Sequence, residues 1–597
     1  MNEILFPLSI TLVVILPLLC AAAIAIRSTD AVAFRLAPWM ALPALVLAVF
    51  VPEDPLLRLP GLLLGTQLGL ADETGRLFLL FTALLWWLAG MYAQSYLSDP
   101  SGRKRFFLYY LLSMTGNFGL ILAQDVASFY LFFTLMSFAS YGLVIHERSI
   151  AALRAGRIYI VLVLIGEVML FAAMVMATAS AGSNGFDDIR KALVQAESRD
   201  LIIFLALIGF GIKAGVLGLH VWLPLAHPVA PTPASAVLSG AMIKAGLLGW
   251  LRLLPLGEVA FLSWGDAFIA LGLATAFYGV LIGLTQRDPK TLLAYSSISQ
   301  MGILTTAVGI GLTAPDTYPA MLTVITLYAM HHGLNKGALF LGVGLIGACS
   351  GTQRRWVGLA LLLPALALAG APFTSGMVTK VLLKAQVSTA PTNWVPVLEI
   401  LLPCSAVATT LLVGRFLWFL AISRSGASDK PAPVGLVWPW ALLIALALAL
   451  PWWFVAKSPF LWSQSALVSS LWPVLLGIVL IGMAVVWQSR LRRKPGVTPL
   501  EHEQLSRESL QPSIPPGDIL VPISRVVNVI LAHGHRLAVE QLPRWRAAGS
   551  ALLDRQRSNL IWSQIYKRIE PVLNNWHTGL TVLLLLGLLL AYIGSTG

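Results

Sequence analysis

The chain has 597 residues, of which 57% are hydrophobic and 11% are charged, with a formal net charge of +13. So little polar surface excludes a water-soluble fold of this size and indicates a protein with many transmembrane helices. The positive charge does not indicate nucleic-acid binding, because Lys and Arg are concentrated in short loops between apolar segments.

A transmembrane helix needs about 20 apolar residues, and about sixteen segments qualify on that length. They centre near Val14, Pro43, Trp86, Ser113, Thr134, Glu167, Ile208, Met242, Thr275, Gln300, Tyr328, Gly376, Thr410, Ile444, Gly477 and Leu585. The first, residues 4–26, lacks the basic flank of a signal peptide and is interpreted as a true span. The Pro-interrupted region 356–386 holds either one broken helix or two.

The charges of the connecting loops alternate along the chain. Loops after odd-numbered spans are basic and contain Arg103, Lys104, Arg105, Arg148, Arg287, Lys290, Arg354 and Arg355. Loops after even-numbered spans contain Asp72, Asp125, Asp187, Asp188 and Asp316. Because basic loops stay in the cytoplasm, this pattern predicts a multi-pass protein of the bacterial inner membrane with its N-terminus outside.

Composition divides the chain into seven segments. We expect N-terminal spans in 1–100, two repeats in 101–255 and 256–425, further spans in 426–488, a cytoplasmic linker in 489–516, an amphipathic segment in 517–570 and a final span in 571–597. The amphipathic segment is too polar to span. It is either one long helix on the membrane surface or several short interfacial helices broken near Pro543.

Ionisable residues inside the spans are the candidate functional residues. They are Glu167, Lys213, Lys244, His331, His332, Lys336 and Lys380. A lysine at the bilayer centre costs roughly 2.5–3.5 kcal/mol, so each one marks a candidate site. Lys384 lies near enough to a helix end for its ammonium to reach the membrane surface.

Buried lysines and histidines are suited to proton transfer. Burial disfavours the charged form of lysine, and histidine changes charge near neutral pH. Prolines interrupt the helices beside two of the lysines, at Pro224–Pro233 and at Pro372. Interrupted helices in two halves of a membrane chain indicate inverted repeats with a transport path between them.

No cofactor or metal site is apparent. The sequence lacks GxGxxG, P-loop and catalytic-triad motifs, and Cys20, Cys349 and Cys404 are isolated from one another. We therefore expect no cofactor, no metal ligand and no catalytic residue in this chain. Redox chemistry would take place on other subunits.

Four stretches resemble one known family. They are GLHVWLPLAHPVAPTPASAVLSGAMIKAG (218–246), LLAYSSISQMGIL (292–304), HHGLNKGALF (331–340) and GAPFTSGMVTK (370–380). Over residues 75–510 the chain is similar to the antiporter-like subunits of respiratory complex I, of energy-converting hydrogenases and formate hydrogenlyases, and of Mrp sodium/proton antiporters. The hydrogenase-type members are the most similar.

The resemblance implies an all-α fold with about fourteen core spans, two inverted five-helix repeats with broken helices, a lateral helix and a C-terminal anchor. It also implies roles. Lys213 would be the broken-helix lysine of the first half, and Lys244 its bridging partner. His332 and Lys336 would form the central bridge, and Lys380 would open to the outside.

Two positions depart from the family pattern. Thr134 stands where members have a glutamate in the fifth span, and Leu225 stands where many have an acid. Glu167 falls where some members have a carboxylate in the sixth span. We therefore expect Glu167 to lie within direct or one-water reach of Lys213.

The leading functional hypothesis is a proton-translocating subunit of a respiratory or hydrogenase-type oxidoreductase complex, with other membrane and peripheral subunits as partners. One alternative is the proton-flux subunit of an inorganic-carbon uptake complex, which the missing fifth-span glutamate favours. Another is an Mrp-type sodium/proton antiporter subunit. Sequence alone does not separate protons from sodium.

Overall fold

The computed structural model describes residues 2–26, 30–50, 56–62, 65–422, 431–455, 459–492, 514 and 517. One compact unit comprises Met1–Leu57 and Gln67–Gly517 and holds every candidate site residue. The described residues are overwhelmingly helical, which confirms the predicted all-α class. Two short strands, β1 (Leu56–Leu59) and β2 (Thr66–Gly69), are the exceptions. The predicted lateral helix beyond Gly517, the anchor and most of the linker lie outside the described residues.

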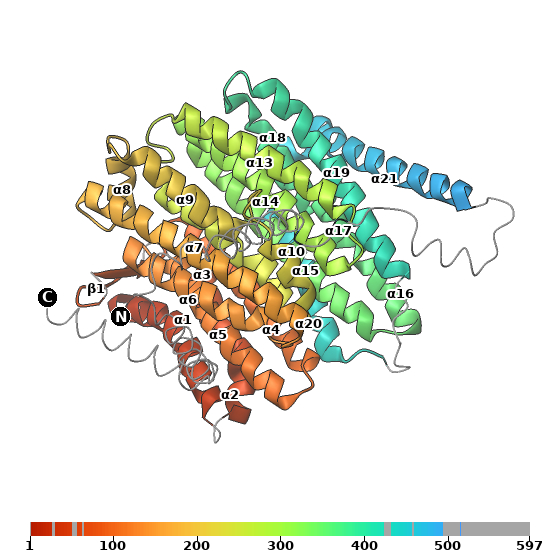
Figure 1. The fold of residues 1–597 in the computed structure, drawn as a ribbon, viewed down its shortest axis with the longest axis horizontal. Helices are drawn as coiled ribbons and strands as arrows, with labels where there is room; N and C mark the ends of the chain where they lie inside the picture. The colour runs from red at the N-terminus through yellow and green to blue at the C-terminus, as the bar shows by residue number, and fades with distance from the viewer. Residues whose placement is uncertain are drawn as a thin grey trace, which may run out of the picture. The chain divides into compact units, whose positions relative to one another are not determined.

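The helices follow one another with short connections (Figure 1). They are α1 (Asn2–Ala25), α2 (Asp30–Leu36), η1 (Ala37–Ala41), α3 (Leu42–Phe50), α4 (Glu73–Tyr96), α5 (Pro100–Leu122), α6 (Val126–Val144), α7 (Ile150–Ala181), α8 (Phe186–Leu193), α9 (Arg199–Ala214), α10 (Trp222–Val229), α11 (Thr232–Val237), η2 (Leu238–Met242), α12 (Lys244–Leu253), α13 (Leu262–Gly283), α14 (Pro289–Thr313), η3 (Pro315–Thr317), α15 (Tyr318–Ala348), α16 (Gly351–Ala360), α17 (Leu362–Ala369), α18 (Ser375–Ala385), η4 (Val387–Thr389), α19 (Val395–Ile422), α20 (Val434–Val455), η5 (Pro459–Trp462) and α21 (Gln464–Arg492).

Ten helices in the described part of the chain are long and apolar enough to cross a membrane. Each contains one of the predicted span centres. The helices Pro289–Thr313 and Pro315–Ala348 are bent by 119° relative to each other, and counting this pair as one span brings the number to eleven. The total of fourteen spans remains a prediction. The interrupted spans consist of helices that are too short to cross a membrane singly, since α9 has 16 residues and α18 has 11.

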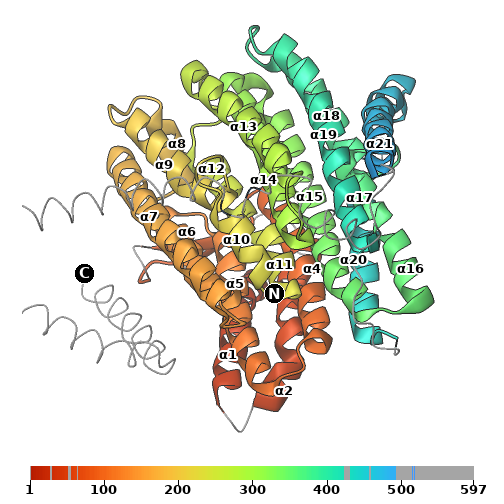
Figure 2. The same cartoon turned by 45° about the vertical axis from the view of Figure 1, so that its right-hand side comes forward.

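Side-chain burial separates central from peripheral helices. Every residue of α14 from Thr291 to Thr313 is buried. Helix α7, by contrast, exposes Val168, Phe171 and Val175 by 64%, 56% and 51%. Its outward side chains are apolar, which suits a helix that faces lipid. Figure 2 shows α14 and α15 enclosed by the other helices, so polar residues on them are shielded from lipid.

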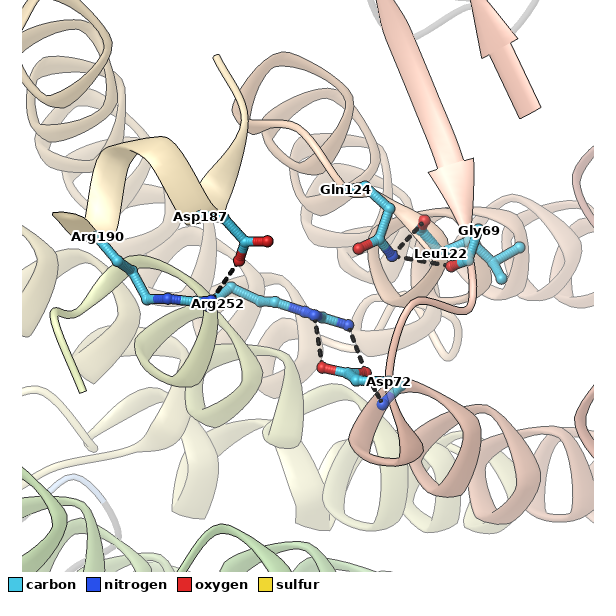
Figure 3. A network of polar contacts seen from close by, with 8 residues as sticks. Gly69, Asp72, Leu122, Gln124, Asp187, Arg190 and Arg252 are labelled. Carbon is cyan, nitrogen blue, oxygen red and sulfur yellow. Dashed lines mark hydrogen bonds and ion pairs between the residues drawn. The ribbon is translucent and has the colours of Figure 1, made fainter. Parts of the chain in front are cut away.

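A polar network holds one end of α12 (Figure 3). Arg252 donates to both carboxylate oxygens of Asp72, at 2.8 and 3.1 Å. The same carboxylate caps α4 by accepting from the Gly75 N–H at 2.6 Å. Beside this pair, Arg190 and Asp187 of α8 form an ion pair. Since Arg252 ends the helix that begins at Lys244, this network fixes the helix that carries the second candidate lysine.

Candidate proton-transfer site

The first interruption of a transmembrane helix lies directly after Lys213. Helix α9 ends at Gly215, which is left-handed at φ 78°, and α10 begins only at Trp222. A Cβ atom at Gly215 would collide with the Leu223 side chain, so both conformation and space require glycine here. Lys213 lies in the last turn of α9 and is 3% exposed.

The Lys213 ammonium is held by a tyrosine and not by a carboxylate. Its Nζ donates to the Tyr159 hydroxyl at 3.1 Å. Three ring centroids surround it, those of Phe133, Tyr159 and Trp222, at 5.9, 5.5 and 6.0 Å. Rings at this range attract a cation through their negative faces. The charged form is therefore stabilised by π electrons and one neutral oxygen.

The Tyr159 hydroxyl belongs to a short chain of hydroxyl groups. It lies within 2.8 Å of the Ser137 carbonyl oxygen and is also hydrogen-bonded to the Ser140 hydroxyl. Ser140 in turn reaches the Ser137 carbonyl at 2.9 Å. Each hydroxyl has one proton to donate, so two proton arrangements satisfy the same oxygens. Such a chain can pass a proton by reorienting its hydroxyl groups.

Glu167 lies two turns along α7 from Tyr159, on the same side of the helix because the residues are eight apart. Its Oε2 accepts from the Thr134 hydroxyl at 2.6 Å, while Oε1 has no hydrogen-bond partner within the part of the chain that the structure describes. Within the described residues no ion pair joins Glu167 to Lys213, so the direct contact expected from the sequence is not formed. The two charges do interact electrostatically. Reach through one water stays a prediction.

Lys244 begins α12 at a second irregularity, the π turn η2. Its ammonium donates to the Ser239 carbonyl inside that turn, and the Ser239 hydroxyl is 2.7 Å from that of Ser297 on α14. π turns leave carbonyls without their regular helical donors, and they occur frequently at functional sites. Gly240 packs against Gly333 of α15, where a Cβ atom would come within 2.7 Å of the opposing carbonyl oxygen. This contact brings η2 against the central histidines.

The central helix α15 carries His331, His332, Asn335 and Lys336, all fully buried. Lys336 donates to the Leu293 carbonyl of α14 at 3.0 Å. His331 Nδ1 is 2.9 Å from the Ser375 hydroxyl at the start of α18. Among the described residues, neither ring nitrogen of His332 has a hydrogen-bond partner, and the electrostatic neighbours of this ring are Lys244, Lys336 and His331.

Lys380, like Lys213, lies close to an interruption between two helices. Helix α17 ends at Gly370, left-handed at φ 91°, and α18 begins at Ser375. The Lys380 ammonium turns back and donates to the Ala369 carbonyl at 2.9 Å. Terminal helix carbonyls lack intrahelical donors and carry partial negative charge. A cavity of about 30 Å³, which has room for at least one water molecule, borders Lys380 and Tyr328 and extends to Ser469 and Ser470.

The structure therefore brings the predicted residues into two groups. One contains Glu167 and Lys213. The other runs from Lys244 through His332, Lys336 and His331 to Lys380, since His331 interacts electrostatically with both end lysines. The region 356–386 contains parts or all of three helices, α16, α17 and α18.

Sequence reasoning missed several participants. Tyr159 could have been found, because it is the one hydroxyl-bearing residue between Arg157 and Glu167 and stands at helical spacing from the glutamate. Asn335 binds the His331 carbonyl at 2.8 Å, and Ser375 binds the same histidine's ring. The contact between His331 and Ser375 joins residues that are 44 positions apart, so no local sequence pattern predicts it.

Comparison with known proteins identifies relatives of one kind. Residues 123–402 match the family model described as NADH:quinone oxidoreductase/Mrp antiporter, transmembrane. Hydrogenase-4 component B of Escherichia coli is 30% identical over 331 residues, covering 52% of this chain and 49% of that protein. A putative antiporter subunit mnhA2 of Staphylococcus saprophyticus is 34% identical, covering 50% of this chain and 41% of the relative. The chain thus spans about half or less of these curated relatives.

Two solved structures share the fold. The Mrp complex from Dietzia sp. DQ12-45-1b aligns with a TM-score of 0.66 at 22% identity, covering 95% of this chain and 62% of that one. The membrane-bound sulfane sulfur reductase, an archaeal respiratory membrane complex, aligns with a TM-score of 0.63 at 22% identity, covering 94% of this chain and 100% of the other. Both similarities concern the arrangement of the helices.

Proposed function

We propose that the chain, whose residues 123–402 match the family model of NADH:quinone oxidoreductases and Mrp antiporters, is a proton-translocating subunit of a multi-subunit membrane complex. The observation that carries the proposal is the row of basic residues from Lys244 to Lys380, of which Lys244, His332, Lys336 and His331 are fully buried and Lys380 is half-buried. Partner subunits would perform the redox chemistry. We further propose an inner-membrane location with the basic loops in the cytoplasm.

Among the described residues, none of the lysines in this row forms an ion pair with a carboxylate. Lys244, Lys336 and Lys380 each donate to a backbone carbonyl. A neutral oxygen offsets only part of the cost of burying an ammonium group, so a proton is held loosely. Lys244 and Lys336 interact electrostatically, and two like charges in low dielectric resist being present together. A proton arriving at one lysine therefore promotes release from the next.

The test of this function is Lys380→Met, made in the native membrane complex reconstituted into vesicles. Proton pumping measured with a pH-sensitive dye should be abolished, because Met fills a similar volume but carries no proton. Lys191→Met, which removes an exposed lysine of α8, is the matched control and should pump normally. Normal pumping by the Lys380 variant would refute the assignment.

An Mrp-type sodium/proton antiporter subunit is the second candidate, and the 34% identity to a putative antiporter subunit favours it. The same vesicles separate the two functions. Pumping that needs external sodium, and that moves sodium against protons, would favour the antiporter. A proton-flux subunit of carbon uptake remains the third hypothesis, motivated by Thr134 in place of the family glutamate.

A further inference from the structure

Asn335 of α15 and Ser375 of α18 surround one ring nitrogen of His331. The Asn335 Nδ2 atom lies 3.1 Å from His331 Nδ1, and the Ser375 hydroxyl lies 2.9 Å from the same nitrogen. Asn335 Nδ2 also donates to the His331 carbonyl at 2.8 Å and to the Ser375 hydroxyl at 3.3 Å. All three residues are 0% exposed, so bulk water does not compete for these contacts.

The chemistry of these contacts determines which His331 nitrogen carries the proton. A carbonyl oxygen only accepts, so the Asn335 atom that lies 2.8 Å from the His331 carbonyl has to be the amide NH2 group, which only donates. The same NH2 group meets His331 Nδ1, which therefore accepts. A neutral imidazole has one donor nitrogen and one acceptor nitrogen. The neutral His331 ring accordingly holds its proton on Nε2.

Two polar atoms of this cluster have no hydrogen-bond partner among the described residues. They are Asn335 Oδ1 and His331 Nε2. An unpaired polar atom in a buried site is costly and calls for a functional explanation. Asn335 Oδ1 belongs to the same amide that donates to Nδ1. Because the last side-chain torsion of asparagine is roughly two-fold, rotation of the amide would exchange the positions of its oxygen and its nitrogen.

We propose that the Asn335 amide is a two-position switch whose orientations match the two protonation states of His331. This switch rests on the proposed proton-translocating function. Beside the neutral ring, the NH2 group donates to Nδ1, as in the structure. When a lysine of the row loses a proton to Nδ1 and becomes a neutral amine, the imidazolium has N–H groups on both nitrogens. The amide then turns, and Oδ1 accepts from Nδ1–H.

The return step reverses these contacts. When Nδ1 gives its proton to a neutral lysine of the row, the amide turns back and its NH2 group donates to Nδ1 again. The Ser375 hydroxyl follows by rotation, because a hydroxyl donates to a bare nitrogen and accepts from an N–H group. The switch does not depend on which lysine supplies the proton. It makes Asn335 a positioning residue, since it acts through His331.

The titratable groups around His331 come from three helices. Lys380 on α18 and Lys244 on α12 interact electrostatically with its ring, and His332 adjoins it on α15. The Tyr328 ring packs against it edge to face, with centroids 6.0 Å apart. A protonated lysine disfavours a second positive charge nearby, whereas an oxygen that accepts from Nδ1–H favours the imidazolium. The group that faces Nδ1 therefore decides whether the ring is charged beside these lysines.

The same contacts have a purely structural explanation, in which Asn335 only ties α15 to α18. Two substitutions separate this tie from the switch. Asn335→Asp presents acceptor oxygens to Nδ1, whereas Asn335→Leu fills a similar volume and presents neither a donor nor an acceptor. Loss of a tie would slow pumping in both variants without changing its pH dependence. Loss of the switch would move the pH dependence in opposite directions in the two variants.

The experiment measures proton pumping by the native complex in vesicles over a range of pH. Asn335→Asp should raise the pH above which pumping falls to half by about one unit or more, because the carboxylate stabilises the imidazolium. Asn335→Leu should lower this pH and slow pumping about tenfold. Asn117→Asp is the matched control. Asn117 is also a buried amide, but it contacts Trp86 and Met136, so its exchange should leave the pH dependence unchanged.

Infrared difference spectra of the complex between low and high pH give a readout that does not depend on pumping. The parent protein should show a side-chain carbonyl band that moves with pH, shifts when asparagine is labelled with heavy carbon, and is missing in Asn335→Leu. Absence of such a band from the parent protein would overturn the switch, even if the variants do not assemble.

The outcomes distinguish the switch from the function on which it rests. An unchanged pH dependence in both Asn335 variants, together with no pumping by Lys380→Met, would overturn the switch and leave the proposed function intact. A shift in the same direction in both variants would also overturn the switch. Parental pumping by Lys380→Met would overturn the proposed function.

Discussion

At the scale of single residues, the lysines of the candidate site donate hydrogen bonds to neutral oxygen atoms. Lys213 donates to a phenol, and Lys244, Lys336 and Lys380 donate to backbone carbonyls. In the described part of the chain, buried Arg252 forms an ion pair with half-exposed Asp72, away from the row. A strong carboxylate partner would trap each proton. Weak neutral partners keep protons exchangeable, which suits transport better than storage.

Tyr159 gives the sharpest residue-scale prediction. Tyr159→Phe keeps a ring beside Lys213 but removes the oxygen that accepts from its ammonium. Leaving a buried charged donor unpaired costs about 1–3 kcal/mol, so pumping that depends on Lys213 should fall roughly tenfold. Proton pumping in vesicles is the measurement, and Tyr141→Phe on α6 is the control, because its half-buried hydroxyl lies outside this chain of contacts. Parental pumping by Tyr159→Phe beside a defective Lys213→Met would show that Lys213 acts without the tyrosine.

At the scale of elements, helix breaks position the lysines. Gly215 and Gly370 each end a helix in the left-handed region, one just after Lys213 and the other where Lys380 folds back. The π turn before Lys244 supplies the third irregularity. In each case the break frees carbonyls or opens space where a regular helix would have neither. Each helix interruption therefore positions the lysine beside it.

Gly370→Ala tests this coupling. A Cβ atom at Gly370 would come within 2.7 Å of the Lys380 Cδ, so the lysine side chain has to move. Gly182→Ala is the control, because Gly182 is also left-handed, at φ 63°, but has nothing within 4 Å of its Cβ position. Both variants should lose about 1–2 kcal/mol of stability from backbone strain, measured as thermal unfolding in detergent. Only Gly370→Ala should also pump protons more slowly. Equal pumping by both variants would show that the helix interruption at Gly370 does not position Lys380 for proton transfer.

At the scale of the whole molecule, loop charge predicts how the chain lies in the membrane. The Ile514 carbonyl accepts from Gln286 at 2.9 Å, so this point of the linker lies at the connection between α13 and α14. Sequence assigns both the linker and that connection to the cytoplasm. The contact is in accord with the predicted sidedness, which remains to be measured.

Cysteine labelling tests the sidedness directly. Thr352, in the first turn of α16 beside Arg354, and Glu197, between α8 and α9, are both exposed. Thr352→Cys should react with a membrane-impermeant thiol reagent only in inside-out vesicles, and Glu197→Cys only in right-side-out vesicles. The native cysteines, of which Cys404 is exposed, are first replaced by Ser. Labelling of both positions from one side would contradict the alternation of basic and acidic loops.

The sequence by itself determined the all-helical class, the centres of the long spans and the positions of seven ionisable residues within apolar segments. It could do so because lipid allows few polar groups, so each one is conspicuous in an apolar segment. It did not determine their partners. Glu167 binds Thr134 and Lys213 binds Tyr159, because the rotation and packing of α6, α7 and α9 decide which side chains meet. Likewise, the hydrogen bond from Lys336 to the Leu293 carbonyl joins residues far apart in the chain. Only tertiary structure sets such distances, since no local periodicity encodes them.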